Sequence, residues 1–145
     1  MKWAKENKKE IIEFRKKIYE VHNILSDKTK KLGKALNQEF NKINKKAGYF
    51  NLNGKNGFIR WCFIEKSYQE YAIDNTIELD GWNLNLAFRN CSEEYKKEII
   101  NKLIANGIQV LPDKYIDKKH INLVKFDFDV SYEEIVNKNL EIWKI

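Results

Sequence analysis

The first 46 residues constrain the fold more than any other part of the chain. They contain no proline and a single glycine, Gly33, the two residue types that interrupt helices most strongly. Within them, apolar residues recur in steps of three and four at Ile11, Phe14, Ile18, Val21 and Leu25. This spacing predicts an amphipathic helix with one apolar stripe. Because Ile12, Tyr19 and Ile24 widen the stripe, we expect this helix to pack against another part of the protein.

A second helical pattern follows without a clear break. Its apolar positions are Leu32, Leu36, Phe40 and Ile43, and Ala47-Gly48 is a plausible helix end. Ser26 and Asp27 are favourable N-cap residues, so a new helix could begin there. The sequence therefore leaves two alternatives open, a helical hairpin or one long helix. The heptad-like spacing is too short to predict a coiled coil.

The pattern then changes to that of strands and tight turns. We predict strands over residues 49–53, 58–64, 68–79 and 82–88, the third with a break near Asp74-Asn75. Asn53-Gly54, Asn56-Gly57 and Asp80-Gly81 are hairpin dipeptides, because Asn, Asp and Gly tolerate positive φ angles. Four strands joined by short turns form an antiparallel meander, and the N-terminal helices are expected to cover one of its faces.

The remaining residues predict a helix, a β-hairpin and a last helix. Ser92 is the expected N-cap of the first helix, and Asn106-Gly107 is its end. Strands are expected over residues 108–111 and 121–129, joined by a polar loop. Ser131 and Glu134 form a capping box for the last helix. The predicted fold class is α+β, in a single domain of residues 1–145, with a basic helical segment at 1–46 and an α+β body at 47–145.

The charge of the chain is concentrated in its first segment. Residues 1–46 carry fourteen basic and six acidic side chains, whereas residues 47–145 carry thirteen and fifteen. A lysine-rich helical face of this kind predicts an anionic partner, either a nucleic-acid backbone or an acidic nucleoprotein surface. The candidate binding residues are Lys5, Lys8, Lys9, Arg15, Lys16, Lys28, Lys30, Lys31, Lys34, Lys42, Lys45 and Lys46.

Base-specific contacts are not expected from this composition, because the chain has only three arginines against 24 lysines. Trp3 precedes the first apolar turn of the helix. It stacks on a nucleic-acid base, anchors a protein partner or packs onto the fold.

No motif in the chain indicates catalysis. The only histidines, His22 and His120, are far apart in sequence, and no cluster of cysteine and histidine has the spacing of a zinc site. Asp127 and Asp129 share one face of a predicted strand, which would suit a metal-dependent nuclease, but a strand end leading into a helix cap explains them more simply. We therefore assign no catalytic residue, metal ligand or cofactor, and we expect His120 to be exposed.

Three functions follow as hypotheses. The first is a non-catalytic protein that binds nucleic acid, or a complex that handles nucleic acid, through the lysine-rich helix. The second is a small inhibitor from a phage or mobile element that blocks a host defence nuclease by protein–protein contact, as anti-CRISPR proteins do. The third is a metal-dependent nuclease. No apolar run approaches the length of a membrane span, so we expect a cytoplasmic protein without membrane contact, and a homodimer if the Ile11, Phe14 and Ile18 stripe is left uncovered.

Overall fold

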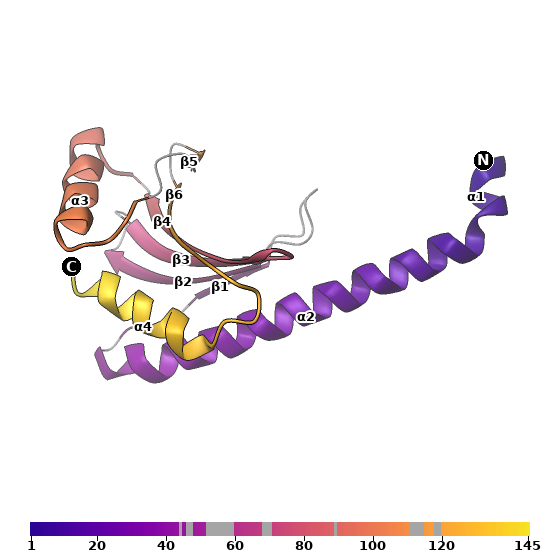
Figure 1. The fold of residues 1–145 in the computed structure, drawn as a ribbon, viewed down its shortest axis with the longest axis horizontal. Helices are drawn as coiled ribbons and strands as arrows, with labels where there is room; N and C mark the ends of the chain where they lie inside the picture. The colour runs from indigo at the N-terminus through magenta and orange to yellow at the C-terminus, as the bar shows by residue number, and fades with distance from the viewer. Residues whose placement is uncertain are drawn as a thin grey trace.

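A computed structural model of the chain describes residues 1–43, 45, 48–51, 60–67, 71–88, 90–110, 115–117 and 120–145, with the backbone path alone for 48–51, 60–67 and 115–117. It is an α+β fold (Figure 1). The helical elements are α1 (Lys2–Glu6), α2 (Lys8–Phe40), a 3₁₀ turn (Asn41–Ile43), α3 (Glu93–Ala105) and α4 (Tyr132–Trp143). The strands are β1 (Gly48–Asn51), β2 (Arg60–Ser67), β3 (Tyr71–Glu78), β4 (Gly81–Phe88), β5 (Tyr115–Asp117) and β6 (His120–Phe126).

The first third of the chain forms one long helix and not a helical hairpin. Helix α2 has 33 residues, which corresponds to a length of about 50 Å. Asp27 does not cap a second helix; its carboxylate instead pairs with Lys31 one turn later, with 2.9 Å between Oδ2 and Nζ. Only the short α1 is set apart, at Asn7, whose side chain donates a hydrogen bond to the Trp3 carbonyl. The helix continues because no strong helix breaker lies between its two apolar patterns.

The described strands form one antiparallel sheet in the order β1-β2-β3-β4-β6-β5. The first four are consecutive, so the predicted meander is confirmed. Strand β3 pairs with β4 without interruption from Tyr71 opposite Phe88 to Glu78 opposite Gly81, and the break expected near Asp74-Asn75 is absent. After α3 the chain returns to place β6 beside β4, with β5 at the edge.

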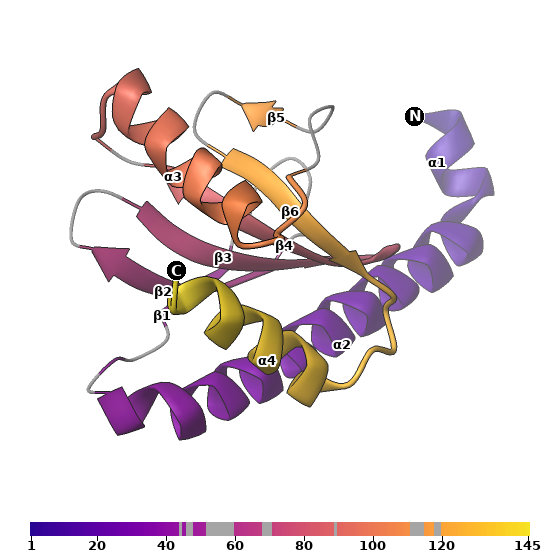
Figure 2. The ribbon, with the colours of Figure 1, turned by 60° about the vertical axis from the view of Figure 1, so that its left-hand side comes forward.

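Helices α2, α3 and α4 pack on the same face of the sheet (Figures 1 and 2). One core cluster joins α2 and α4 to the sheet through Leu25, Leu32, Leu36, Phe40, Ile77, Trp82, Ile135 and Val136. A second cluster joins α3 to β3, β4 and β6. Phe40 and Trp143 meet edge to face, with 5.3 Å between their ring centroids. Each buried leucine of α2 contributes about 1.5–3 kcal/mol of hydrophobic stabilisation.

Both predicted helix caps in the second half of the chain are confirmed. The Ser92 side chain accepts a hydrogen bond from the Tyr95 amide, and the Ser131 side chain accepts one from the Glu134 amide, each at 3.2 Å. Helix α3 ends at Asn106, and Gly107 adopts a φ of 80°. Local hydrogen-bonding chemistry specifies these boundaries, which explains why the sequence predicts them well.

The predicted hairpin exists, but its strands are displaced. Residues 108–110 do not form a strand, although Ile108 is buried in the second core cluster. The first strand of the hairpin is β5, within the segment that was expected to be a loop. Strand β6 ends at Phe126, so Asp127 and Asp129 lie in the following turn and not on a strand. The two Asn-Gly turns lie outside the described residues.

The hairpin between β3 and β4 depends on Gly81. Glu78 pairs with Gly81, so the turn residues are Leu79 and Asp80, one position earlier than the dipeptide indicates. Gly81 has a φ of 133°, and a Cβ atom added there would lie 2.2 Å from the carbonyl oxygen of Phe126. Only glycine combines this backbone angle with such a close approach of β6.

We expect Gly81→Ala to lower the free energy of unfolding by about 3 kcal/mol, because it adds a backbone clash to a disfavoured φ. Gly107→Ala is the matched control. Its φ is also positive but nothing lies within 4 Å of the added Cβ, so its cost should be about 1 kcal/mol. Urea denaturation followed by circular dichroism measures both, and equal losses would contradict the role of the Phe126 contact.

Candidate binding surface on the projecting helix

The N-terminal half of α2 projects beyond the rest of the molecule (Figures 1 and 2). Every side chain over residues 8–20 is exposed except that of Ile18, which is half-buried. Burial against the sheet and α4 begins at Val21 and becomes complete at Leu25. Thirteen residues of helix therefore extend about 20 Å from the body without covering contacts from the described residues.

The apolar stripe of the projecting half is left uncovered. Phe14 is 65% exposed and Ile11 is 38% exposed, although both continue the line of Leu25 and Leu32, which are fully buried. Our expectation that this part of the helix packs against the body is therefore wrong. Trp3, on α1, is 67% exposed, so it does not pack onto the fold. Large apolar side chains gathered on one exposed stripe are typical of an interaction surface.

Seven of the twelve predicted binding residues are exposed and make no ion pair with a described carboxylate. They are Lys5, Lys8, Lys9, Arg15, Lys16, Lys30 and Lys34. All but Lys30 and Lys34 belong to α1 or to the projecting half of α2. Their charges are available to an external partner, since no carboxylate of the described residues lies within ion-pair distance of them.

Four other predicted residues make contacts within the protein. Lys28 donates a hydrogen bond to the Phe128 carbonyl at 3.2 Å, lies 3.7 Å from the Asp129 carboxylate, and sits 4.5 Å from the centre of the Phe128 ring. Lys31 pairs with Asp27, whose carboxylate raises the pKa of the Lys31 ammonium group by accepting its hydrogen bond.

The remaining contacts lie at the C-terminal end of α2. Lys42 pairs with Glu39 at 2.7 Å, and the Lys45 ammonium lies over the ring of Trp143 at 5.7 Å. Lys46 lies outside the described residues. Of the residues in this group, Lys28 is the least available to an external phosphate, because its side chain is only 21% exposed.

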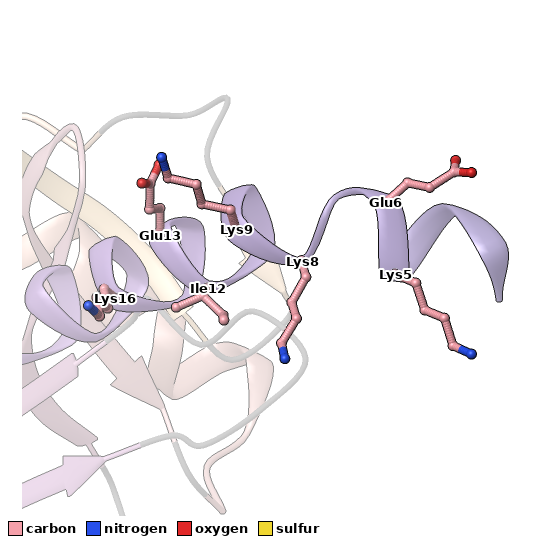
Figure 3. A pocket seen from close by; sticks show the side chains of 7 residues that line it. All are labelled: Lys5, Glu6, Lys8, Lys9, Ile12, Glu13 and Lys16. Atoms are coloured by element: carbon pink, nitrogen blue, oxygen red, sulfur yellow. The ribbon is translucent and has the colours of Figure 1, made fainter.

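The available cations do not form one uniform face. Lys9, Lys16 and Lys30 are separated by multiples of seven residues, so they share a row on the side of α2 opposite the apolar stripe. Glu13, Glu20 and Asp27 follow the same seven-residue spacing in a neighbouring row. Figure 3 shows Lys9 and Glu13 extending from the same side of α2 in that view. The lysine row is thus flanked by acidic groups, which lowers its local potential.

A shallow hollow lies where α1 meets α2. It is lined by Lys5, Glu6, Lys8, Lys9, Ile12, Glu13 and Lys16. All seven belong to one continuous stretch, so no second wall encloses a ligand. In Figure 3, Lys5 and Lys8 extend to one side of the chain and Glu6 to the other. The hollow suits contact with an extended anionic surface better than it suits the enclosure of a small molecule.

The sequence did not reveal a polar cluster on the sheet face opposite the helices. Asn122 donates hydrogen bonds to Asn85 at 2.9 Å and to Asn83 at 3.2 Å, and its own Oδ1 accepts none from the described residues. His120 lies 3.7 Å from Asp74 and is half-buried, which corrects the expectation of an exposed histidine. This cluster joins β4 to β6, which are distant in sequence, so the pattern of β4 alone could not reveal it.

Metal-binding geometry is absent from the described part of the chain. No group of three or more histidine, cysteine, aspartate or glutamate residues there could hold an ion. The Asp129 carboxylate faces Lys28, so a metal ion would have to compete with that ammonium group. In the same residues, no helix is long and apolar enough to span a membrane.

Comparison with known proteins gives no further guidance on the function. Neither a protein-family model, nor a curated protein, nor a solved structure matches this chain. The surface chemistry of the projecting helix is therefore the basis of any functional proposal.

The two halves of α2 should differ in amide hydrogen exchange. We expect the amides of residues 12–20 to exchange about a hundredfold faster than those of residues 29–40, because an unsupported helix of this length is only marginally stable in water. Exchange of the full-length protein, followed by mass spectrometry or NMR, measures the difference. Equal protection of both halves would show that the projecting half is covered in solution.

Proposed function

We propose that this protein is a non-catalytic binding protein that engages nucleic acid, or a complex that handles nucleic acid, through the lysines of α1 and α2. The observation that carries the proposal is the group of seven exposed cations without a described ion pair, most of them on a helix that projects from the body. A projecting helix reaches a polyanion without interference from the near-neutral remainder of the chain.

The contacts in this proposal are made to phosphates and not to bases. Lysine is a flexible point charge and lacks the planar fork with which arginine reads guanine. Six of the seven available cations are lysines, and Arg15 is the exception. Trp3 is exposed near Lys5, so its ring is positioned to stack on an unpaired base at the end of the same surface.

The inhibitor hypothesis uses another side of the same projecting helix, because an uncovered apolar stripe favours contact with a protein. The nuclease hypothesis has less support. Asp127 and Asp129 lie in a turn, and Asp129 is paired with Lys28. We therefore retain binding as the proposed activity.

Replacing three lysines of the exposed row should weaken nucleic-acid binding and its dependence on salt. For the wild type we expect micromolar binding to generic duplex DNA at about 50 mM salt, weakening steeply by about 200 mM. The triple variant Lys9→Gln, Lys16→Gln, Lys30→Gln should lower the log–log salt slope by about 2–3, because each lost phosphate contact removes about 0.9 from it. Fluorescence anisotropy with a labelled duplex measures both quantities.

The matched control removes the same charge from the body. Lys97→Gln, Lys102→Gln and Lys144→Gln replace three exposed lysines that lie far from α2 in the sequence, on α3 and at the C-terminus. This variant should keep the wild-type slope. If both variants lose affinity equally, net charge and not the projecting helix governs binding, and a wild type that fails to bind at low salt would sink the proposal.

A further inference from the structure

The apolar stripe of α2 follows a heptad pattern that runs from the exposed Ile11 and Phe14, through the half-buried Ile18 and Val21, to the buried Leu25. Ile11, Phe14, Ile18, Val21 and Leu25 are spaced three and four residues apart in strict alternation, which corresponds to the two core positions of a coiled coil. Such a stripe presents its side chains to a second helix. The row of Lys9, Lys16 and Lys30 occupies the position opposite this stripe, so the two surfaces face in different directions.

The body already shows what covers the continuation of this stripe. Along the C-terminal half of α2, the buried Leu32 and Phe40 pack with an amphipathic helix, α4, which contributes Ile135 and Val136. Helix α4 carries three glutamates and one lysine. Just before α4 begins, Asp129 faces Lys28 at the edge of the contact. The continuation of the stripe is therefore covered jointly by the sheet, through Ile77 and Trp82, and by an amphipathic helix that carries more acidic than basic side chains.

The margins of the uncovered part of the stripe are mainly basic, as Lys28 is beside the covered part. Lys8 and Arg15 flank the stripe on one side, and Lys17 flanks it on the other together with Glu10. All four side chains are exposed. Charges at these flanking positions select the partner of a helix pair, and an excess of positive charge favours a helix with glutamate or aspartate at its margins.

A second copy of the chain fits this surface less well. In an antiparallel pair with Phe14 opposite Ile18 of the other copy, Arg15 faces Arg15 and Lys17 faces Lys17, which is repulsive. In a parallel pair, both bodies would have to occupy the space between the two helices, because each body lies on the stripe side of its own α2. Charge in this antiparallel register and shape in the parallel pair oppose self-pairing.

We propose that the stripe of Ile11, Phe14, Ile18 and Val21 is a docking site for an acidic amphipathic helix of another protein. The partner helix extends the packing that α4 makes with the C-terminal half of α2. Docking covers the exposed Phe14 and stabilises a helical segment that has no other support among the described residues. This site goes beyond the proposed nucleic-acid contact, because its apolar side chains lie on the side of the helix opposite Lys9, Lys16 and Lys30. Lys8 and Arg15 border both surfaces.

The probe is a synthetic peptide of three heptads with leucine at both core positions and glutamate at both flanking positions. Repulsion between glutamates keeps it from pairing with itself. Titration calorimetry with the full-length protein should show binding, with a gain of helical circular dichroism in the mixture. A matched peptide with lysine at the flanking positions should bind at least about tenfold more weakly.

Two variants with the same charge change locate the site. Phe14→Glu should weaken binding of the glutamate peptide at least about tenfold, whereas Ile12→Glu should change it by no more than about twofold. Ile12 is also exposed, at 45%. The sequence pattern counted it as widening the stripe, but it lies about 100° around the helix from Ile11 and therefore outside the row of Ile11, Phe14 and Ile18. Both positions are exposed, so neither substitution removes a buried contact from the body.

The nucleic-acid proposal and this one fail separately. The triple lysine variant of the opposite row should lose its duplex affinity but keep its peptide affinity. Absent peptide binding, or equal effects of Phe14→Glu and Ile12→Glu, would overturn the docking site. Sedimentation of the protein alone should show a monomer at micromolar concentration. A dimer that Phe14→Glu dissociates would assign the stripe to a second copy instead.

Discussion

The packing of α2 on the sheet and on α4 is the interaction on which the rest of the structure depends. Leu25, Leu32, Leu36 and Phe40 are fully buried, and they link the first third of the chain to β3, β4 and α4. Deleting a buried leucine side chain typically costs 2–5 kcal/mol, so this row supplies a large part of a small domain's stability. The same row fixes the axis of α2 and thereby the direction in which its N-terminal half projects.

The buried leucines of α2 and the exposed Ile11 and Phe14 belong to one continuous apolar stripe on the helix. The stripe does not end where the body ends, and a helix that served only to cover the sheet would gain nothing from Ile11 and Phe14. Exposed side chains of this size carry a cost in solubility that Lys8, Arg15 and Lys17 partly offset. The presence of an exposed apolar stripe and of flanking basic side chains on one projecting helix favours a binding role over a purely structural one.

The sequence predicts the elements whose causes are local. The Ser92 and Ser131 caps, the turn before Gly81 and the order of the meander all follow from short-range chemistry. The predictions that failed concern which side chains are buried, because burial depends on residues that are distant in the sequence. Periodicity showed that Ile11 and Phe14 share a stripe but not that no described residue covers it. Asn85 lies on a polar row of β4, yet it is 1% exposed and hydrogen-bonded to Thr76 of β3 and to Asn122 of β6.

The candidate cations illustrate the same limit. Counting charges located the basic segment correctly. However, Lys28 and Lys31 form ion pairs within the protein, with Asp129 and Asp27. Those residues are distinguished from Lys9 and Lys16 only by what lies opposite them in space. The difference has a physical consequence. Lys28 ties α2 to the turn before α4, and Lys31 pairs with Asp27 on the same helix, whereas the lysines of the projecting half have no ion pair with a described carboxylate. A partner with acidic side chains would pair with the lysines of the projecting half in the way that Asp129 pairs with Lys28 inside the protein.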